Sequence, residues 1–245
     1  MSSAYFNVER LKSSCCSSFE EFNEKNCSPT HEHDDLTYFS RVTSNVSVEL
    51  HQTFATLDQT VGILSDFKLL INAGKPIKAE QIQKIVEALN SQIKTGTHLS
   101  QELNRFAFFA DVRLEEYKLA SVLTNLYDLV RRFAVLKGGK LVINYPKESL
   151  KIKGDPFAIM HSVFLAYQAL LTAMEPDTAI TVSTLETAST VSVLVDGPKI
   201  ELSSSGCIAG ECDLGYINCV LQKEKGSSEY YTDDTGTHFV LTIPK

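Results

Sequence analysis

The sequence predicts an α+β fold in which a long antiparallel helical hairpin precedes a sandwich of helices on one sheet. Two observations predict this class. Apolar residues recur every three or four positions over most of residues 36–106, which is a helical period. After residue 112, helical segments alternate with β-branched segments of alternating polarity. We therefore divide the chain into a tail expected to be mobile (1–34), the hairpin (35–112) and the sandwich (113–245).

Composition limits the classes of function. With 43% apolar and 22% charged residues, the 245-residue chain is typical of a folded soluble protein. The net charge of −7 argues against a general nucleic-acid binder, and no apolar run is long enough to span a membrane. The N-terminal residues lack the basic and apolar segments of a secretory signal, so we expect a cytoplasmic protein.

Possible metal ligands are scattered. The six cysteines show no CxxC pair and no regular spacing, so we expect reduced thiols and no zinc site. The segment HEHDD (31–35) could bind a metal loosely, but a charged segment that caps a helix explains it better. We therefore predict no metal site.

The first helix should begin near Asp34 or Asp35, whose side chains can cap free backbone N–H groups. It should end near Ile71, because the glycine and proline of NAGKP (72–76) stop a helix. Its apolar seam is formed by Leu36, Phe39, Val42, Val46, Leu50, Phe54, Leu57, Val61 and Leu64.

A second helix should begin near Lys78 and end near Val112. Two long helices with a short connection form an antiparallel hairpin. A lone hairpin cannot bury both apolar seams, so we predict a homodimer whose two hairpins make a four-helix bundle. The second seam is formed by Ile82, Val86, Leu89, Ile93, Leu103 and Phe106, with Gly96 as a weak position.

The sandwich follows in chain order. Helices are expected at 114–139, at 155–174 with Pro156 in the first turn, and at 213–226. Alternation and β-branching predict strands at KLVINYP (140–146), SLKIKGD (149–155), AITVSTLE (179–186), TVSVLVD (190–196), KIELS (199–203) and THFVLTIP (237–244). This order predicts one sheet with helices on one face.

Several segments, in this order, resemble the core of bacterial sensor histidine kinases. GTHFVLTIP (236–244) is similar to the family's last strand, GTTFTFTLP, and residues 154–173 are similar to its helix GDPxRLxQVLxNLLxNA. VDGPKI (195–200) is similar to the DNGPGI turn, and YINCVLQKEKG (216–226) stands where the family has AIVKRIVELHG. HQTFATL (51–57) takes the place of the phosphorylated motif HELRTPL. The resemblance implies a dimerising hairpin and an ATP-binding-type sandwich over about residues 35–245.

The chain departs from the family where kinase chemistry needs particular side chains. The Asn that holds Mg²⁺ is matched by Ala169, and Leu165 precedes it on the same face, although a hard cation requires oxygen ligands. The acid/base after the histidine is matched by Gln52, which cannot take a proton, and the helix-kinking proline is Thr56. Autophosphorylation by ATP is therefore not expected.

The nucleotide-binding turns are also altered. The glycine-rich turn, whose backbone N–H groups would cradle phosphate, reads ECDLG (211–215), so only Gly215 is left near it. Asp196 matches the acidic residue that reads adenine, and Gly197 matches the glycine of that turn. We interpret these three residues as vestiges of a nucleotide site and expect no cofactor of the protein's own.

A kept sandwich with lost kinase chemistry resembles the kinase-derived, ChpT-type histidine phosphotransferases. This implies that His51 relays phosphate between response-regulator receiver domains, each receiver supplying its own Mg²⁺. Two other interpretations stay open. One is a non-catalytic pseudokinase that scaffolds or inhibits a response regulator. The other is a divergent but active histidine kinase.

Elementary chemistry agrees with His51 as the site. A neutral imidazole can attack an aspartyl phosphate if it is exposed to the partner. His51 follows the seam residue Leu50 by about 100° around the helix, so it should lie beside the seam. Ser47, Ala55 and Asp58 share its stripe and are the predicted docking residues, with Ala55 small enough to leave room.

The other histidines and a basic pair are weaker candidates. His98, on the second helix, is the only rival phosphorylation site. His161 should be a core residue, and His238, on the last strand, should have no catalytic role. Arg131 and Arg132 could pair with an acidic partner, but solvated helix charges explain them better.

Overall fold

The computed structural model describes residues 31–111, 116–147, 150–200, 207–208 and 212–245. The residues from Tyr38 to Lys245 form one compact unit, and those up to Thr37 belong to another. Most of the predicted tail, and the cysteines in it, lie outside the described residues.

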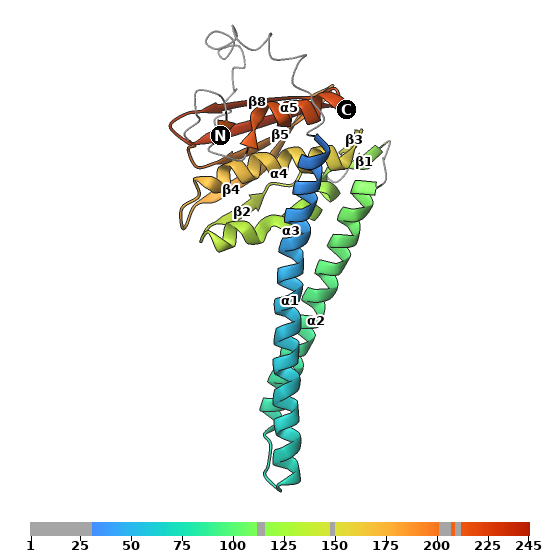
Figure 1. Cartoon of the computed structure of the whole chain (residues 1–245), viewed down its shortest axis with the longest axis vertical. Helices are drawn as coiled ribbons and strands as arrows, with labels where there is room; N and C mark the ends of the chain where they lie inside the picture. Colours follow the sequence, from blue (N-terminus) through green and yellow to red (C-terminus); the bar gives the residue numbers. More distant parts are fainter. Residues whose placement is uncertain (1–30, 112–115, 148–149, 201–206, 209–211) are drawn as a thin grey trace. The chain divides into compact units, whose positions relative to one another are not determined.

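Two long helices, α1 (His31–Asn72) and α2 (Ala79–Asp111), form the predicted antiparallel hairpin (Figure 1). The predicted start of α1 was wrong by three residues or more, because the helix already begins at His31 and Asp34 and Asp35 lie inside it. Its predicted end is confirmed. The turn after Asn72 contains Gly74 at a φ of 70°, a left-handed conformation that glycine adopts without a steric cost.

The predicted apolar seams of the hairpin are only partly confirmed. The buried positions along the middle of α1 are Thr53 and Thr60, and a Cβ built on Gly96 of α2 would lie 3.5 Å from the Thr53 methyl carbon. Several seam residues are instead uncovered in the single chain, namely Phe54, Val61, Leu64, Ile82, Val86 and Ile93. The small threonines let the two helices meet while the larger apolar side chains face outward.

The sandwich is built on a five-stranded sheet of order β2-β4-β5-β9-β8, in which only β2 and β4 pair in parallel. Short pairs β1–β3 and β6–β7 lie outside it. The strands are β1 (Glu116–Lys118), β2 (Lys140–Ile143), β3 (Lys151–Lys153), β4 (Ala179–Glu186), β5 (Thr190–Gly197), β6 (Cys207–Ile208), β7 (Cys212–Asp213), β8 (Ser227–Thr232) and β9 (Thr237–Pro244). The helices are α3 (Leu119–Leu136), α4 (Pro156–Thr172) and α5 (Leu214–Lys223).

One face of the sheet is covered by helices, as predicted. Along β5, Val191, Val193 and Val195 are buried, whereas the residues between them are only half-buried. The buried side faces α4, because a Cβ built on Gly197 would lie 3.1 Å from a methyl carbon of Leu170. The helices α3 and α5 pack beside α4 on the same layer (Figure 1). Alternation of burial along β5 thus marks the face of the sheet that the helices cover.

Two points of the predicted element order need correction, and one predicted strand is largely untested. Residues 116–118 are strand and not helix, because they pair antiparallel with β3 and Lys151 forms an ion pair with Glu116. The strand β8 was missed; it pairs with β9, and its Tyr230 packs against Phe239. The predicted strand KIELS lies mostly outside the described residues, and Ile200 before them is not in a strand.

Hairpin and sandwich meet in an aromatic cluster. The Tyr38 ring of α1 stacks on His161 of α4 with centroids 4.5 Å apart, and Phe106, Phe157 and Phe164 surround the pair. His161 is therefore a buried core residue, as predicted.

No helix in the described part of the chain is long and apolar enough to cross a membrane.

A buried hydrogen bond also holds the hairpin against the sandwich. The Asn45 side chain of α1 donates a hydrogen bond of 2.7 Å from Nδ2 to the carbonyl oxygen of Leu129 in α3. Asn45 is buried, so this bond replaces contacts with water that the amide has lost. It therefore holds α1 against the sandwich six residues before His51.

Candidate functional site

His51 lies in the middle of α1 with its side chain exposed. The predicted docking residues Ser47, Ala55 and Asp58 are exposed as well. Because residues four and seven apart share one helix face, these side chains and His51 form a continuous outward stripe. The geometry thus leaves the imidazole accessible to a second protein.

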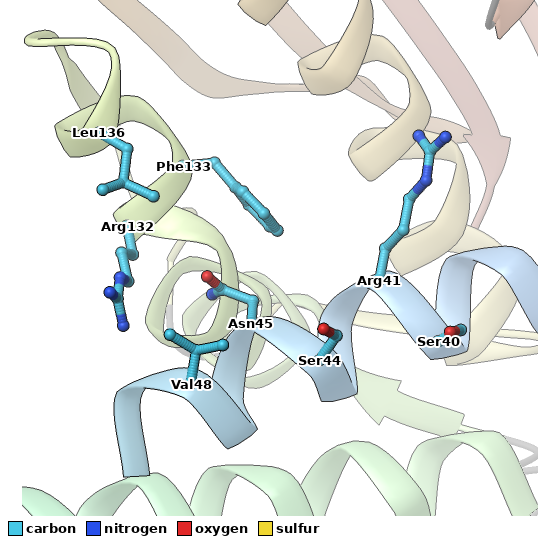
Figure 2. Close-up of a pocket in the computed structure, with 8 residues that line it drawn as sticks. All are labelled: Ser40, Arg41, Ser44, Asn45, Val48, Arg132, Phe133 and Leu136. Carbon is cyan, nitrogen blue, oxygen red and sulfur yellow. The ribbon is translucent and has the colours of Figure 1, made fainter. Parts of the chain in front are cut away.

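The stripe of His51 runs into a pocket between α1 and α3 of about 410 Å³. Figure 2 shows its lining, in which α1 and α3 contribute opposite walls: Ser40, Arg41, Ser44, Asn45, Val48, Arg132, Phe133 and Leu136. Ser44 and Val48 precede His51 by seven and three positions, so they lie on its face of the helix. The pocket combines apolar walls with two arginines.

Arg132 was predicted to be a solvated charge on the helix surface, but part of its side chain is buried. It lines the pocket, and its Nη1 atom is buried with no hydrogen-bond partner among the described residues. Arg131, the other member of the basic pair, is exposed as expected. The spacing of α3 alone could not reveal this difference, because the second wall comes from α1. An acidic or phosphorylated group entering the pocket would meet a guanidinium.

The rival histidine has a close carboxylate neighbour. His98 Nε2 lies 3.4 Å from Asp128 Oδ2, which brings α2 and α3 together. The imidazole of His98 is about half exposed, whereas the Asp128 side chain is largely covered. His98 is thus held against the sandwich by Asp128, whereas His51 is exposed on α1.

The residues at the kinase-like positions are spread over the sandwich. Ala169 is buried in α4, and Leu165 is half-buried on the same helix. Gly215 is exposed in the first turn of α5, while Asp196 and Gly197 lie at the end of β5. No side-chain oxygen occurs at either α4 position, so neither could ligate a cation.

Asp196 takes part in a cluster that the sequence analysis missed. Its Oδ1 lies 2.7 Å from His238 Nδ1, and His238 Nε2 lies 3.0 Å from Thr235 Oγ1 and 3.3 Å from Asp233 Oδ1. Tyr231 stacks on the histidine ring. Asp196 and His238 are register partners on β5 and β9. Strand register was the missing information, since the two residues are far apart in sequence.

The turn beside this cluster makes folding stability depend on pH. Hydrogen bonds from the Thr235 hydroxyl and then its backbone N–H lower the pKa of Asp233 from 3.8 to about 2. Ionised Asp233 therefore stabilises the folded state above pH of about 4, and this contribution disappears as the pH falls to about 2. We expect the urea midpoint of Asp233→Asn to lie below that of the wild type at pH 6, with the gap closing between pH 4 and 2. Asp234→Asn is the matched control, and a pH-independent gap would contradict the prediction.

Comparison with known proteins gives structural likenesses only. No protein-family model matches the chain, and no curated protein matches it. The nucleotide-free catalytic domain of histidine kinase ThkA aligns with a TM-score of 0.48 and 16% identity, over 53% of this chain and 94% of that one. ThkA in complex with the response regulator TrrA aligns at 0.48 and 12%, over 90% of this chain and 68% of that one.

A histidine kinase from Burkholderia phymatum STM815 aligns with a TM-score of 0.46 and 13% identity, over 84% of this chain and 97% of that one. These TM-scores are all below 0.5, so the likenesses carry no conclusion about activity. The mixed helical and sheet architecture follows from the chain's own elements.

Proposed function

We propose that the protein is a histidine phosphotransferase that relays phosphate between response-regulator receiver domains through His51. The observation that carries this proposal is the exposed imidazole on an outward stripe of α1, with small or polar neighbours and a pocket at one end. A transfer histidine must reach an aspartate on another protein, and His51 is accessible for that contact. The same stripe supplies a surface for the receiver.

The transfer needs little from this chain beyond a neutral, accessible nitrogen. A ring nitrogen of His51 attacks the phosphorus of the receiver's aspartyl phosphate, the P–O bond to the aspartate breaks, and a carboxylate leaves. In the reverse step, the carboxylate of a second receiver takes the phosphoryl group from the histidine. The receiver would bring the Mg²⁺ that neutralises phosphoryl charge. The neutral Gln52 beside His51 is compatible with this reaction.

The sandwich residues favour a protein donor over ATP. The alanine at 169 and the leucine at 165 offer no oxygen for a metal ion. Asp196, the one matched adenine-reading residue, is hydrogen-bonded to His238. We propose that the sandwich supports the hairpin and extends the docking surface through the pocket beside Arg132.

The donor decides between the interpretations. Full-length protein is incubated with ATP and Mg²⁺, and separately with a receiver phosphorylated by a small-molecule phosphodonor. We expect acid-labile phosphohistidine only in the second mixture. Label from ATP would establish a divergent kinase instead. Tight receiver binding without label in either mixture would leave a non-catalytic scaffold.

We also propose that two chains pair through the uncovered apolar face of the hairpin. Phe54 and Val61 of α1 are more than half exposed in the single chain, and burial is worth about 1.5–3 kcal/mol for each such side chain. The face continues on α2 through Val86 and Ile93. A second hairpin seated there would complete a four-helix bundle.

Charges placed in this face should separate the chains. Light scattering after size-exclusion chromatography should give twice the chain mass of 27.2 kDa for the wild type, and a single chain mass for the double variant Phe54→Glu, Val61→Glu. Gln59→Glu adds a charge to an exposed polar position of α1 and should remain dimeric. A wild-type protein that is monomeric at micromolar concentration would contradict the pairing.

A further inference from the structure

We propose that His98, Glu102 and Asp128 form a binding site for one divalent transition-metal ion, with Zn²⁺ as the best fit, that clamps α2 to α3. Each residue offers one ligand atom, and the three atoms lie within 4.8 Å of one another. Imidazole nitrogen and carboxylate oxygens are ligands that Zn²⁺ takes in proteins. The three residues include neither His51 nor any member of the cluster around His238.

The distance between His98 and Asp128 suits a metal ion. Bonds of about 2.0–2.2 Å in tetrahedral geometry place two ligand atoms roughly 3.3–3.6 Å apart. His98 Nε2 and Asp128 Oδ2 are 3.4 Å apart, which is longer than a good hydrogen bond and within this ligand spacing. Three protein ligands would leave a fourth position for water.

The fold presents the three side chains to one point. His98 and Glu102 are four residues apart on α2 and therefore lie on one face of that helix. Asp128 comes from α3, which packs against α2. A metal ion at this point would need little rearrangement of the backbone.

The next layer of contacts also resembles a ligand site. Glu102 is only 4% exposed, and Asn125 Nδ2 donates to its Oε2 at 2.9 Å and to its backbone carbonyl at 2.7 Å. Such outer contacts orient ligating carboxylates in metal sites. The two carboxylates outnumber the one guanidinium, Arg105 at 3.1 Å from Glu102 Oε2, so the local charge favours a dication.

A second observation points to a missing group. The Oδ1 atom of Asn125 is buried and has no hydrogen-bond partner in the described structure, although Nδ2 of the same amide contacts Glu102. Buried polar atoms without partners are rare in folded proteins. A bound water molecule would be a donor of the kind that this oxygen lacks.

Zinc titration of the full-length protein tests the site. Calorimetry should detect one more equivalent of bound Zn²⁺ in the wild type than in His98→Ala or in Asp128→Asn, which keeps the size of the side chain. The cysteines and the segment 31–35 are the same in every variant, so any zinc they hold cancels in the difference. His51→Ala removes an exposed histidine elsewhere and should bind as many equivalents as the wild type.

Two outcomes would overturn the site. Equal stoichiometry in the wild type and in a folded Asp128→Asn, shown folded by circular dichroism, would mean that His98 and Asp128 form only an ion pair. A wild type that binds no zinc at micromolar concentration would exclude the site as well. Neither outcome depends on phosphate transfer, so the metal site and the proposed function stand or fall separately.

Discussion

Replacing His51 with alanine should abolish labelling of the protein by a phosphorylated receiver. Alanine has no nucleophilic nitrogen, so the aspartyl phosphate cannot be attacked, and the loss should be at least a thousand-fold in the rate of transfer. This range corresponds to roughly 4 kcal/mol of activation free energy at tenfold per 1.36 kcal/mol. Rapid-quench measurement of label with a fixed receiver concentration gives the rate. The variant should keep the thermal stability of the wild type, since His51 is exposed.

The control for this loss is the next residue along the helix. Gln52→Ala also shortens an exposed polar side chain of α1 and should keep the rate within about threefold, which is roughly 0.7 kcal/mol. Receiver binding by His51→Ala should remain measurable by calorimetry, because the stripe and the pocket are unchanged. Label that survives in His51→Ala and is lost in His98→Ala would place the site on α2.

The second large effect concerns the buried amide between α2 and α3. Asn125→Leu removes the donor to Glu102 Oε2 and to the Glu102 carbonyl, which leaves a buried carboxylate short of one hydrogen bond. We expect a loss of about 3 kcal/mol in the free energy of unfolding. For a chain of this size, that lowers the melting temperature by roughly 6–12 °C. Thermal unfolding in the presence of EDTA measures the effect without bound metal.

A double variant shows whether the stability lost in Asn125→Leu comes from the Glu102 carboxylate, which lacks its hydrogen-bond donor in that variant. Glu102→Met with Asn125→Leu replaces both polar partners by apolar groups of similar size, which can be close to neutral. We therefore expect the double variant to recover most of the stability lost in Asn125→Leu. If the two single losses add in the double variant, the two side chains are not coupled in this way.

The hairpin illustrates what the sequence can and cannot predict. Its two helices and the turn at Gly74 follow from the helical period and from stop signals. The same period cannot separate side chains that face the neighbouring helix, such as Thr53, from those that face outward, such as Phe54. Two neighbouring residues can each belong to a series of positions spaced by three or four. Only the packed structure shows which of the two series faces the neighbouring helix.

Strand errors had a different cause. The residues before α3 include good helix formers, and pairing with β3 overrides that preference at Glu116–Lys118. The edge strand β8 is rich in polar residues, and its membership of the sheet depends on β9 as a partner. Local preference is a weak guide wherever long-range pairing supplies the backbone hydrogen bonds.

The candidate site was predictable to the extent that it lies on one helix. His51 and its stripe were read correctly as exposed, because they depend only on the turn of α1. The pocket beside Arg132 and the approach of His98 to Asp128 need α3 to pack against α1 and α2. Contacts between elements are not encoded in the spacing of a single segment, so these features appear only in the folded chain.

The hydrogen bond from Asn45 to the Leu129 carbonyl fixes one point of α1 against α3. Ile71 lies 26 residues beyond that bond, or about 39 Å at 1.5 Å per residue, and His51 only about 9 Å. If α1 tilted by about 5° around this hydrogen bond, Ile71 would move by roughly 3.4 Å and His51 by roughly 0.8 Å. The His51 imidazole would therefore move little over a range of tilts of the distal hairpin, where the proposed second chain would be bound.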